Sequence, residues 1–208
     1  HGVLVAKKII AMSYISNLDD FLASFSTLDA DDFGMLDRGQ FSTILTKIVD
    51  LNAVAPATGR AAASAANAAG LDFVDGGIIG GPPRPDSTYT PRLYVSGPRA
   101  TELEVLNETS LDFRVLGEGI GAASAIKMCY AALTKGLTAI GIHSMVTARL
   151  EGVDEALMAE LAFSQKDLLR HLERGLPDMC PKAYRWIGEM EEISKTHVDG
   201  GLPGEMFI

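Results

Sequence analysis

The stretch that decides the fold is Leu71–Pro85, LDFVDGGIIGGPPRP, in which an apolar run passes directly into glycines and prolines. Glycine has no Cβ, so this composition lets the chain turn sharply and lets another group come very close to the main chain. The simpler interpretation is a tight connection between two elements. The alternative is the floor of a ligand site, and the flanking segments decide what such a site could be.

The segments around the glycine stretch alternate between strand and helix patterns. A short β-rich run over 46–51 (TKIVDL) precedes an alanine-rich helix over 57–70 that Gly70 closes, and LDFVD over 71–75 is the next strand. Further strands are predicted over 93–97 and 111–117, with a helix over 99–109 between them. Strands joined by helices and short links predict an α/β domain with a partial Rossmann-like parallel sheet and right-handed crossovers.

The pattern changes at Gly117. Residues 117–150 carry apolar and small side chains at nearly every position, without proline or strand alternation, which predicts one long helix buried on most sides. Its glycines and alanines would let a second helix pack closely, as in a bundle or a dimer interface. More helical segments follow. We therefore expect a truncated or degenerate Rossmann-like domain over 1–116 and an all-α domain over 117–208.

The composition narrows the classes of partner. The chain has 208 residues, 47% of them hydrophobic, and a formal net charge of −9, which is ordinary for a soluble globular protein and argues against binding to nucleic acid or an anionic membrane. No apolar run is long enough to cross a bilayer. Cys129 and Cys180 lie far apart without metal-type spacing, so we expect free thiols, a buried Cys129, no metal site and a reduced, cytoplasmic compartment.

Three stretches occur in the order found in the β-hydroxyacid dehydrogenases and 6-phosphogluconate dehydrogenase: VDLNAVAP (49–56), FVDGGIIGGPP (73–83) and GEGIGAASAIKMCYAALTKG (117–136). The ending PKAYRWIGEMEEI (181–193) resembles one branch of phosphogluconate-dehydrogenase-like oxidoreductases, whose helical C-terminal domain is of uncharacterised function. The resemblance implies an NAD- or NADP-dependent oxidoreductase with a small-molecule substrate between two domains. It also implies a homodimer formed through the helix over 117–150.

The resemblance implies roles for particular residues. Lys127 falls on the family's catalytic lysine, a general acid/base that exchanges a proton with the substrate hydroxyl or carbonyl and favours negative charge on its oxygen. The alternative is a lysine whose amine extends from the helix to water. Gly80 and Gly81 would bind substrate, and Gly76 and Gly77 would bind the nicotinamide, with backbone N–H groups available to an anion.

Some positions depart from the family's pattern. The family's asparagine four residues after the lysine is Ala131 here, and the serine of its substrate loop is Ile79. Both changes remove hydrogen-bond partners, so we expect a less polar carbonyl or imine rather than a small hydroxyacid. Tyr130 could partly substitute, or could pack in the core. Asn52 lies where the nicotinamide and ribose are expected, although a helix N-cap or local turn fits it equally well.

The cofactor fingerprint is absent from the first 48 residues, which contain no G-x-G-x-x-G between a strand and a helix. In a Rossmann domain the pyrophosphate sits on the N-terminus of that helix. The first residue is His1 rather than methionine. We therefore expect either that the chain starts inside a longer gene product or that it has lost cofactor binding. In the second case it would be a cofactor-free binding or dimerisation module.

Overall fold

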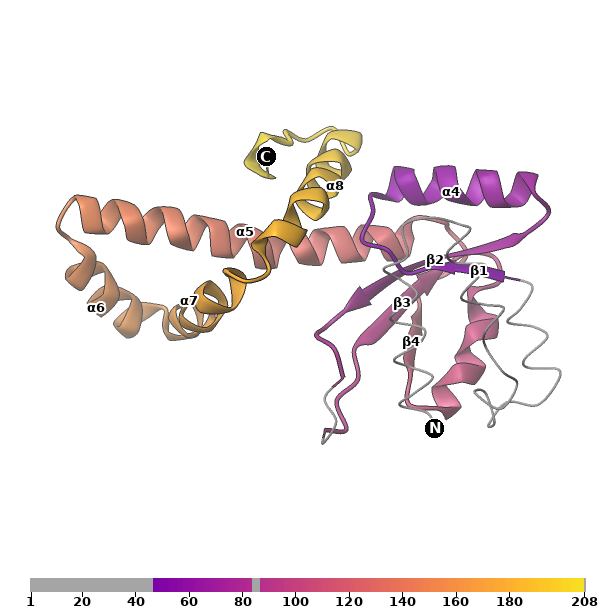
Figure 1. Cartoon of the computed structure of the whole chain (residues 1–208), viewed down its shortest axis with the longest axis horizontal. Helices are drawn as coiled ribbons and strands as arrows, with labels where there is room; N and C mark the ends of the chain where they lie inside the picture. The colour runs from indigo at the N-terminus through magenta and orange to yellow at the C-terminus, as the bar shows by residue number, and fades with distance from the viewer. Residues whose placement is uncertain (1–46, 84–86, 208) are drawn as a thin grey trace. The chain divides into compact units, whose positions relative to one another are not determined.

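The structure, a computed structural model, describes residues 47–83 and 87–207 (Figure 1). The chain divides into two compact units, of which the first ends at Met128 and the second begins at Cys129. The first unit contains a sheet with helices and the second is helical, so the predicted class, α/β followed by all-α, is confirmed. Most of the segment 1–48, whose sequence lacks the dinucleotide fingerprint, lies outside the described residues.

The sheet of the first unit is mixed rather than parallel throughout. Its described strands are β1 (Lys47–Asp50), β2 (Asp72–Ile79), β3 (Arg92–Ser96) and β4 (Asp112–Val115), paired in that order. The pairs β1–β2 and β3–β4 are parallel, and their connections contain α4 (Pro56–Ala68) and the 3₁₀ helix η2 (Ala100–Glu108). The β2–β3 pair is antiparallel, because the described residues between these strands supply no crossover helix.

Each face of the sheet has its own core, because successive residues of a strand point to opposite sides. Phe73 of β2 packs with Ala63 and Ala66 of α4, which lies along this face (Figure 1). Val74 belongs to the larger cluster on the other face, under η2. That cluster comprises Leu51, Val74, Leu93, Val95, Ala100, Leu103, Leu106, Leu111 and Phe113.

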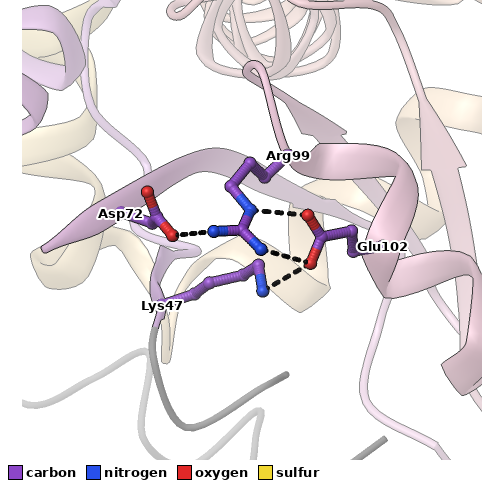
Figure 2. A network of polar contacts seen from close by, with 4 residues as sticks. All are labelled: Lys47, Asp72, Arg99 and Glu102. Atoms are coloured by element: carbon purple, nitrogen blue, oxygen red, sulfur yellow. Dashed lines mark hydrogen bonds and ion pairs between the residues drawn. The ribbon is translucent and has the colours of Figure 1, made fainter. Parts of the chain in front are cut away.

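An ionic network joins η2 to the starts of β1 and β2 (Figure 2). The Nζ atom of Lys47 lies 2.6 Å from a carboxylate oxygen of Glu102, which also accepts hydrogen bonds from Arg99 at 2.5 and 3.1 Å. Arg99 donates at 2.5 Å to Asp72 as well. The hydrogen bonds from Arg99 and then Lys47 lower the pKa of Glu102 to about 2. Because Lys47 and Asp72 begin their strands, the network lies at the N-terminal ends of β1 and β2. The predicted site lies at the other end of β2.

The second unit is built from the remaining helices. They are the part of α5 (Ala122–Leu150) after Met128, α6 (Asp154–Ser164), α7 (Lys166–Met179), η3 (Ala183–Arg185), α8 (Trp186–Asp199) and η4 (Glu205–Phe207). A Cβ at Gly141 of α5 would lie only 3.3 Å from Cγ of Leu172 on α7, so a small residue does permit close helix packing here. Lys135 of α5 forms a largely buried ion pair with Glu189 of α8 at 2.6 Å.

The prediction that the helix over 117–150 is buried on most sides is wrong. One face of α5 exposes Tyr130, Leu133, Leu137 and Ile140, with exposed fractions of 40 to 68%. Cys129 is also exposed, as is Cys180, and both are free thiols. The sequence pattern predicts the apolar character of this helix correctly, but the described chain provides no element that covers this face.

Within the described ranges, no helix combines the length and apolarity that crossing a membrane requires.

Candidate functional site

The predicted site residues of the first unit lie at the C-terminal half of β2. In the register of the sheet, the last residue of β1, Asp50, pairs with Asp75, so β2 continues past β1 for four residues and there pairs with β3. Gly76 and Gly77 are therefore buried strand residues, and the prediction that this strand ends at residue 75 is wrong. The strand ends at Ile79, and Gly80 and Gly81 follow it. Ligands of α/β sheets bind at such carboxyl ends of strands.

Gly77 lies directly under the start of α5. A Cβ at Gly77 would lie 2.8 Å from Cβ of Lys127 and 3.0 Å from the carbonyl oxygen of Ala123. Contacts under 3.0 Å are not tolerated between such atoms, so any larger residue here would displace the helix. The base of the Lys127 side chain is thus held against the one stretch of β2 that has no side chains. Lys127 is itself partly buried.

Gly76 faces the other side of the sheet and is equally confined. A Cβ there would lie 2.5 Å from Cδ2 of Leu51 and 2.8 Å from the carbonyl oxygen of Asp50. The group that comes close to these two glycines is therefore the protein itself, a helix above Gly77 and the end of β1 beside Gly76. Close packing of the protein itself accounts for both positions, whereas a tight connection between two elements does not, because both glycines lie within β2. A role in nicotinamide binding remains a prediction.

The next two glycines have different surroundings. Gly80 has a φ of 128°, and a Cβ there would meet the Tyr89 hydroxyl and Pro91. The backbone N–H of Gly81 donates a hydrogen bond to the Tyr89 hydroxyl at 3.2 Å, and the space on the Cβ side of Gly81 is open to 4 Å. Of the four glycines, Gly81 alone has room beside it for a ligand.

Asn52 lies in an exposed turn after β1. Its backbone N–H and its side-chain amide both donate to Oδ1 of Asp50, at 3.0 and 2.6 Å. This is the local turn role predicted as one of two alternatives. A contact with a coenzyme stays a prediction.

The two positions that depart from the family's pattern are apolar in the structure as well. Ile79 ends β2 and is partly buried, and Ala131 is 2% exposed. Tyr130 is 48% exposed, so its side chain does not belong to the core. Tyr130 and Ala131 follow Lys127 on α5 by three and four residues, about one helical turn.

Two residues that the sequence analysis did not single out hold the first turn of α5. The buried carboxylate of Asp75 accepts hydrogen bonds from the backbone N–H groups of Gly121 and Ser124, both at 3.0 Å. The Ser96 hydroxyl donates to Asp75 at 3.0 Å and accepts from the N–H of Ala123 at 3.1 Å. A carboxylate in the middle of a buried strand is a usable signal, because burial of such a group requires hydrogen-bond partners.

The described residues do not form a cradle for the phosphates of a dinucleotide. A pyrophosphate site needs glycines between a strand and the helix that follows it. The described strand-to-helix turn before α4 is Leu51–Ala55, LNAVA, and the helix starts at a proline without a side-chain cap. The described chain also contains no group of three His, Cys, Asp or Glu side chains that could hold a metal ion.

Comparison with known protein families gives a match over the C-terminal helices. Residues 148–208 match the domain of unknown function DUF1932. A conserved hypothetical protein from Sinorhizobium meliloti 1021 has 29% identity and a TM-score of 0.61, over 76% of this chain and 54% of that one. None of the curated proteins is significantly similar.

Two further solved structures share the fold. A conserved protein of unknown function, described as structurally similar to 3-hydroxyacid dehydrogenases, has 29% identity and a TM-score of 0.63, over 76% of this chain and 63% of that one. The 3-hydroxyisobutyrate dehydrogenase from Salmonella typhimurium has 14% identity and a TM-score of 0.57, over 77% and 61%. This chain thus spans less than two thirds of each of these proteins. The described chain has the fold of the 3-hydroxyacid dehydrogenase-like proteins and carries the DUF1932 domain over residues 148–208, which confirms the resemblance seen in its motifs.

Proposed function

We propose that this chain takes part in an NAD- or NADP-dependent oxidoreductase in which Lys127 is the general acid/base. The observation that carries the proposal is the position of the Lys127 side chain, whose Cβ lies 2.8 Å from the place that a Cβ on Gly77 would occupy. The lysine therefore starts at the end of β2, where α/β sheets bind ligands. The sequence identity of 29% to a protein described as similar to 3-hydroxyacid dehydrogenases also supports this.

In this proposal Lys127 handles the proton. During reduction its ammonium donates a proton to the substrate oxygen or nitrogen, and during oxidation its amine takes that proton back. A positive charge at this point also favours the negative charge that develops on a carbonyl oxygen. The nicotinamide, when bound, supplies or accepts the hydride.

The residues at two positions favour a less polar substrate. Ile79 and Ala131 replace hydrogen-bonding side chains of the resembling family, and an apolar site rejects a hydroxyacid whose carboxylate would lose its partners. A ketone or an imine with an apolar substituent fits these residues better.

Coenzyme titration tests the proposal. NADH and NADPH are added to the 208-residue chain up to millimolar concentration, and coenzyme fluorescence and the thermal midpoint are followed. Saturable binding with a raised midpoint is expected, because a ligand that binds the folded state stabilises it. If neither coenzyme changes fluorescence or midpoint, the oxidoreductase function of this chain is refuted and the cofactor-free binding module remains.

We also propose that α5 forms a homodimer interface. Tyr130, Leu133, Leu137 and Ile140 recur at intervals of three and four residues, which places them along one face of the helix, and all four are exposed. An apolar helical stripe of this kind fits a second copy of the same stripe. Both the enzyme and the cofactor-free module would use this interface.

The oligomeric state tests this interface. Light scattering coupled to size exclusion should report twice the chain mass for the wild type and the chain mass for Leu133→Glu. Leu71→Glu is the matched control, because Leu71 is an exposed leucine of the first unit and is not part of the stripe. A monomeric wild type, or equal dissociation by both variants, contradicts the proposed interface.

A further inference from the structure

We propose that Asp75, with Ser96, is a positioning residue that fixes the start of α5 on the sheet and thereby sets where the Lys127 side chain lies over Gly77. The inference rests on the proposed function only for the part that Lys127 plays. Asp75 and Gly77 are two residues apart on β2, so both face the same side of the sheet. The helix that starts against the carboxylate also covers the glycine.

The carboxylate of Asp75 is fully engaged. Its Oδ2 atom accepts hydrogen bonds from the N–H groups of Gly121 and Ser124 and from the Ser96 hydroxyl, each at 3.0 Å. Its Oδ1 atom accepts one from the Ser124 hydroxyl at 2.5 Å. The residue is 1% exposed. These four contacts come from β3 and from the first turn of α5.

The contacts solve a problem that every helix start presents. The first N–H groups of an α-helix have no partner within the helix, and a nearby residue of the same segment usually caps them. Here the acceptors come from the sheet, since the N–H of Ala123 is bound by Ser96 and that of Ser124 by Asp75. The cap is therefore also a tether. A negative charge at this end of the helix is favoured by the helix dipole.

The neighbouring helix leaves the carboxylate little freedom. A Cβ at Gly59 of α4 would lie 3.0 Å from Oδ1 of Asp75 and 3.3 Å from the Ser124 hydroxyl, so a larger residue at this position would press on the pair. A buried carboxylate that lost its hydrogen bonds would be strongly unfavourable. The start of α5 is consequently restricted to the position in which these donors reach Asp75.

The tether is close enough to set the position of Lys127. Ser124 precedes Lys127 by three residues, which is less than one turn and about 4.5 Å along the helix axis. Ala123, whose N–H is bound by Ser96, presents its carbonyl oxygen 3.0 Å from the Cβ position of Gly77. The first turn is thus held by hydrogen bonds at its start and by the glycine contact at its end. A shift of the start of α5 relative to Asp75 and Ser96 would therefore move Lys127 as well.

The substitution Asp75→Asn separates position from charge. The amide oxygen can replace Oδ2 and accept the N–H groups, while the amide NH₂ donates to the Ser124 hydroxyl, which can accept. Asp75→Ala removes all four contacts. Asp112→Ala is the matched control, because it removes a sheet carboxylate that pairs with Arg114 on the surface.

The experiment measures Lys127 directly in the 208-residue chain. Acetic anhydride labels lysine amines, and peptide mass spectrometry reads the labelling rate of Lys127 beside that of the other lysines. Amide hydrogen exchange reports on Ser124. In Asp75→Ala we expect exchange at Ser124 to rise about tenfold, the effect of losing a hydrogen bond to a charged group. The labelling rate of Lys127 should change severalfold in Asp75→Ala, because the lysine moves with the first turn of α5. In Asp75→Asn and in Asp112→Ala this rate should stay near that of the wild type.

The outcomes are distinct from those of the coenzyme titration, because neither readout needs coenzyme or substrate. An unchanged Lys127 labelling rate in Asp75→Ala, with Ser124 deprotected, overturns the positioning role. An equal change of the Lys127 labelling rate in Asp75→Asn and in Asp75→Ala also overturns the positioning role. If Asp75→Ala does not fold, Ser96→Ala carries the test, because it removes the acceptor of the Ala123 N–H. Deprotection of Ala123 without a change at Lys127 then overturns the proposal.

Discussion

The contact between Gly77 and α5 yields a prediction whose sign can be worked out. Gly77→Ala adds one methyl group to β2, and that atom would lie 2.8 Å from Cβ of Lys127 and 3.0 Å from the carbonyl oxygen of Ala123. Gly77 is not among the described glycines with positive φ, so alanine can adopt its backbone conformation. The contact alone therefore decides whether the variant is less stable.

Two opposing effects set the magnitude. Replacing glycine restricts the unfolded chain and stabilises the protein by about 0.4–1 kcal/mol where the backbone allows it. Overpacking costs about 1–3 kcal/mol, and the neighbours here are a Cβ and a main-chain oxygen that cannot swing away. We expect a net loss of about 1–2 kcal/mol, which lowers the urea midpoint by about 0.5–1 M.

Urea unfolding followed by circular dichroism measures this effect. Gly81→Ala is the matched control, since nothing lies within 4 Å of its Cβ position, and it should unfold at or slightly above the wild-type midpoint. In a double-mutant cycle, Gly77→Ala should couple to Lys127→Gly, which removes the opposing Cβ, and much less to Lys127→Ala, which keeps it. A Gly77→Ala chain as stable as the wild type would refute the close approach of α5 to β2.

The remaining predictions concern ion pairs. The pKa of Glu102 is lowered from 4.5 to about 2, so its contribution to stability is complete above pH 4.5 and is lost as the pH falls towards 2. Because its side chain is 31% exposed, we expect a contribution of about 1 kcal/mol, and acid titration of Glu102→Gln by thermal unfolding should lack this component. Lys135→Met should destabilise the chain by about 2–3 kcal/mol, because it leaves Glu189 with a poorly solvated charge. The double variant Lys135→Met/Glu189→Met should recover most of that loss in urea unfolding, and a double variant less stable than Lys135→Met contradicts this account.

Local sequence signals were sufficient for most elements of the fold. The β-rich run ending at Asp50 forms β1, and the alanine-rich segment forms a helix that begins at Pro56 and is closed by Gly70 in a left-handed conformation. These signals depend on residues close together in the chain, such as a proline at the first helical turn and a glycine after the last.

Signals that depend on distant parts of the chain were missed. The glycines that follow residue 75 predict a turn there, because they let the chain bend sharply. Gly76 and Gly77 instead lie within β2, where Leu51 and Lys127 occupy the space beside them. The antiparallel direction of β3 was also missed; the described residues between β2 and β3 supply no crossover helix. The acceptor role of Asp75 requires knowing that α5 begins above it, which no spacing in the sequence reveals.

The apolar residues of α5 differ from their predicted burial for another reason. Their spacing predicts a buried face, but burial also requires a partner, and a single chain sequence does not say whether that partner belongs to the same chain. Leu133 is 68% exposed in the described structure. The proposed second copy would supply the missing cover.

The most direct test of Lys127 as the proton-transfer group compares turnover in the wild type and in Lys127→Met. The absorbance of NADPH is followed with a ketone or imine substrate at saturating coenzyme, and coenzyme binding is measured separately by fluorescence. We predict unchanged coenzyme affinity and a kcat lowered by about 10²–10⁴, the usual contribution of a positioned acid or base. A Lys127→Met chain that turns over as fast as the wild type would contradict the role assigned to this lysine.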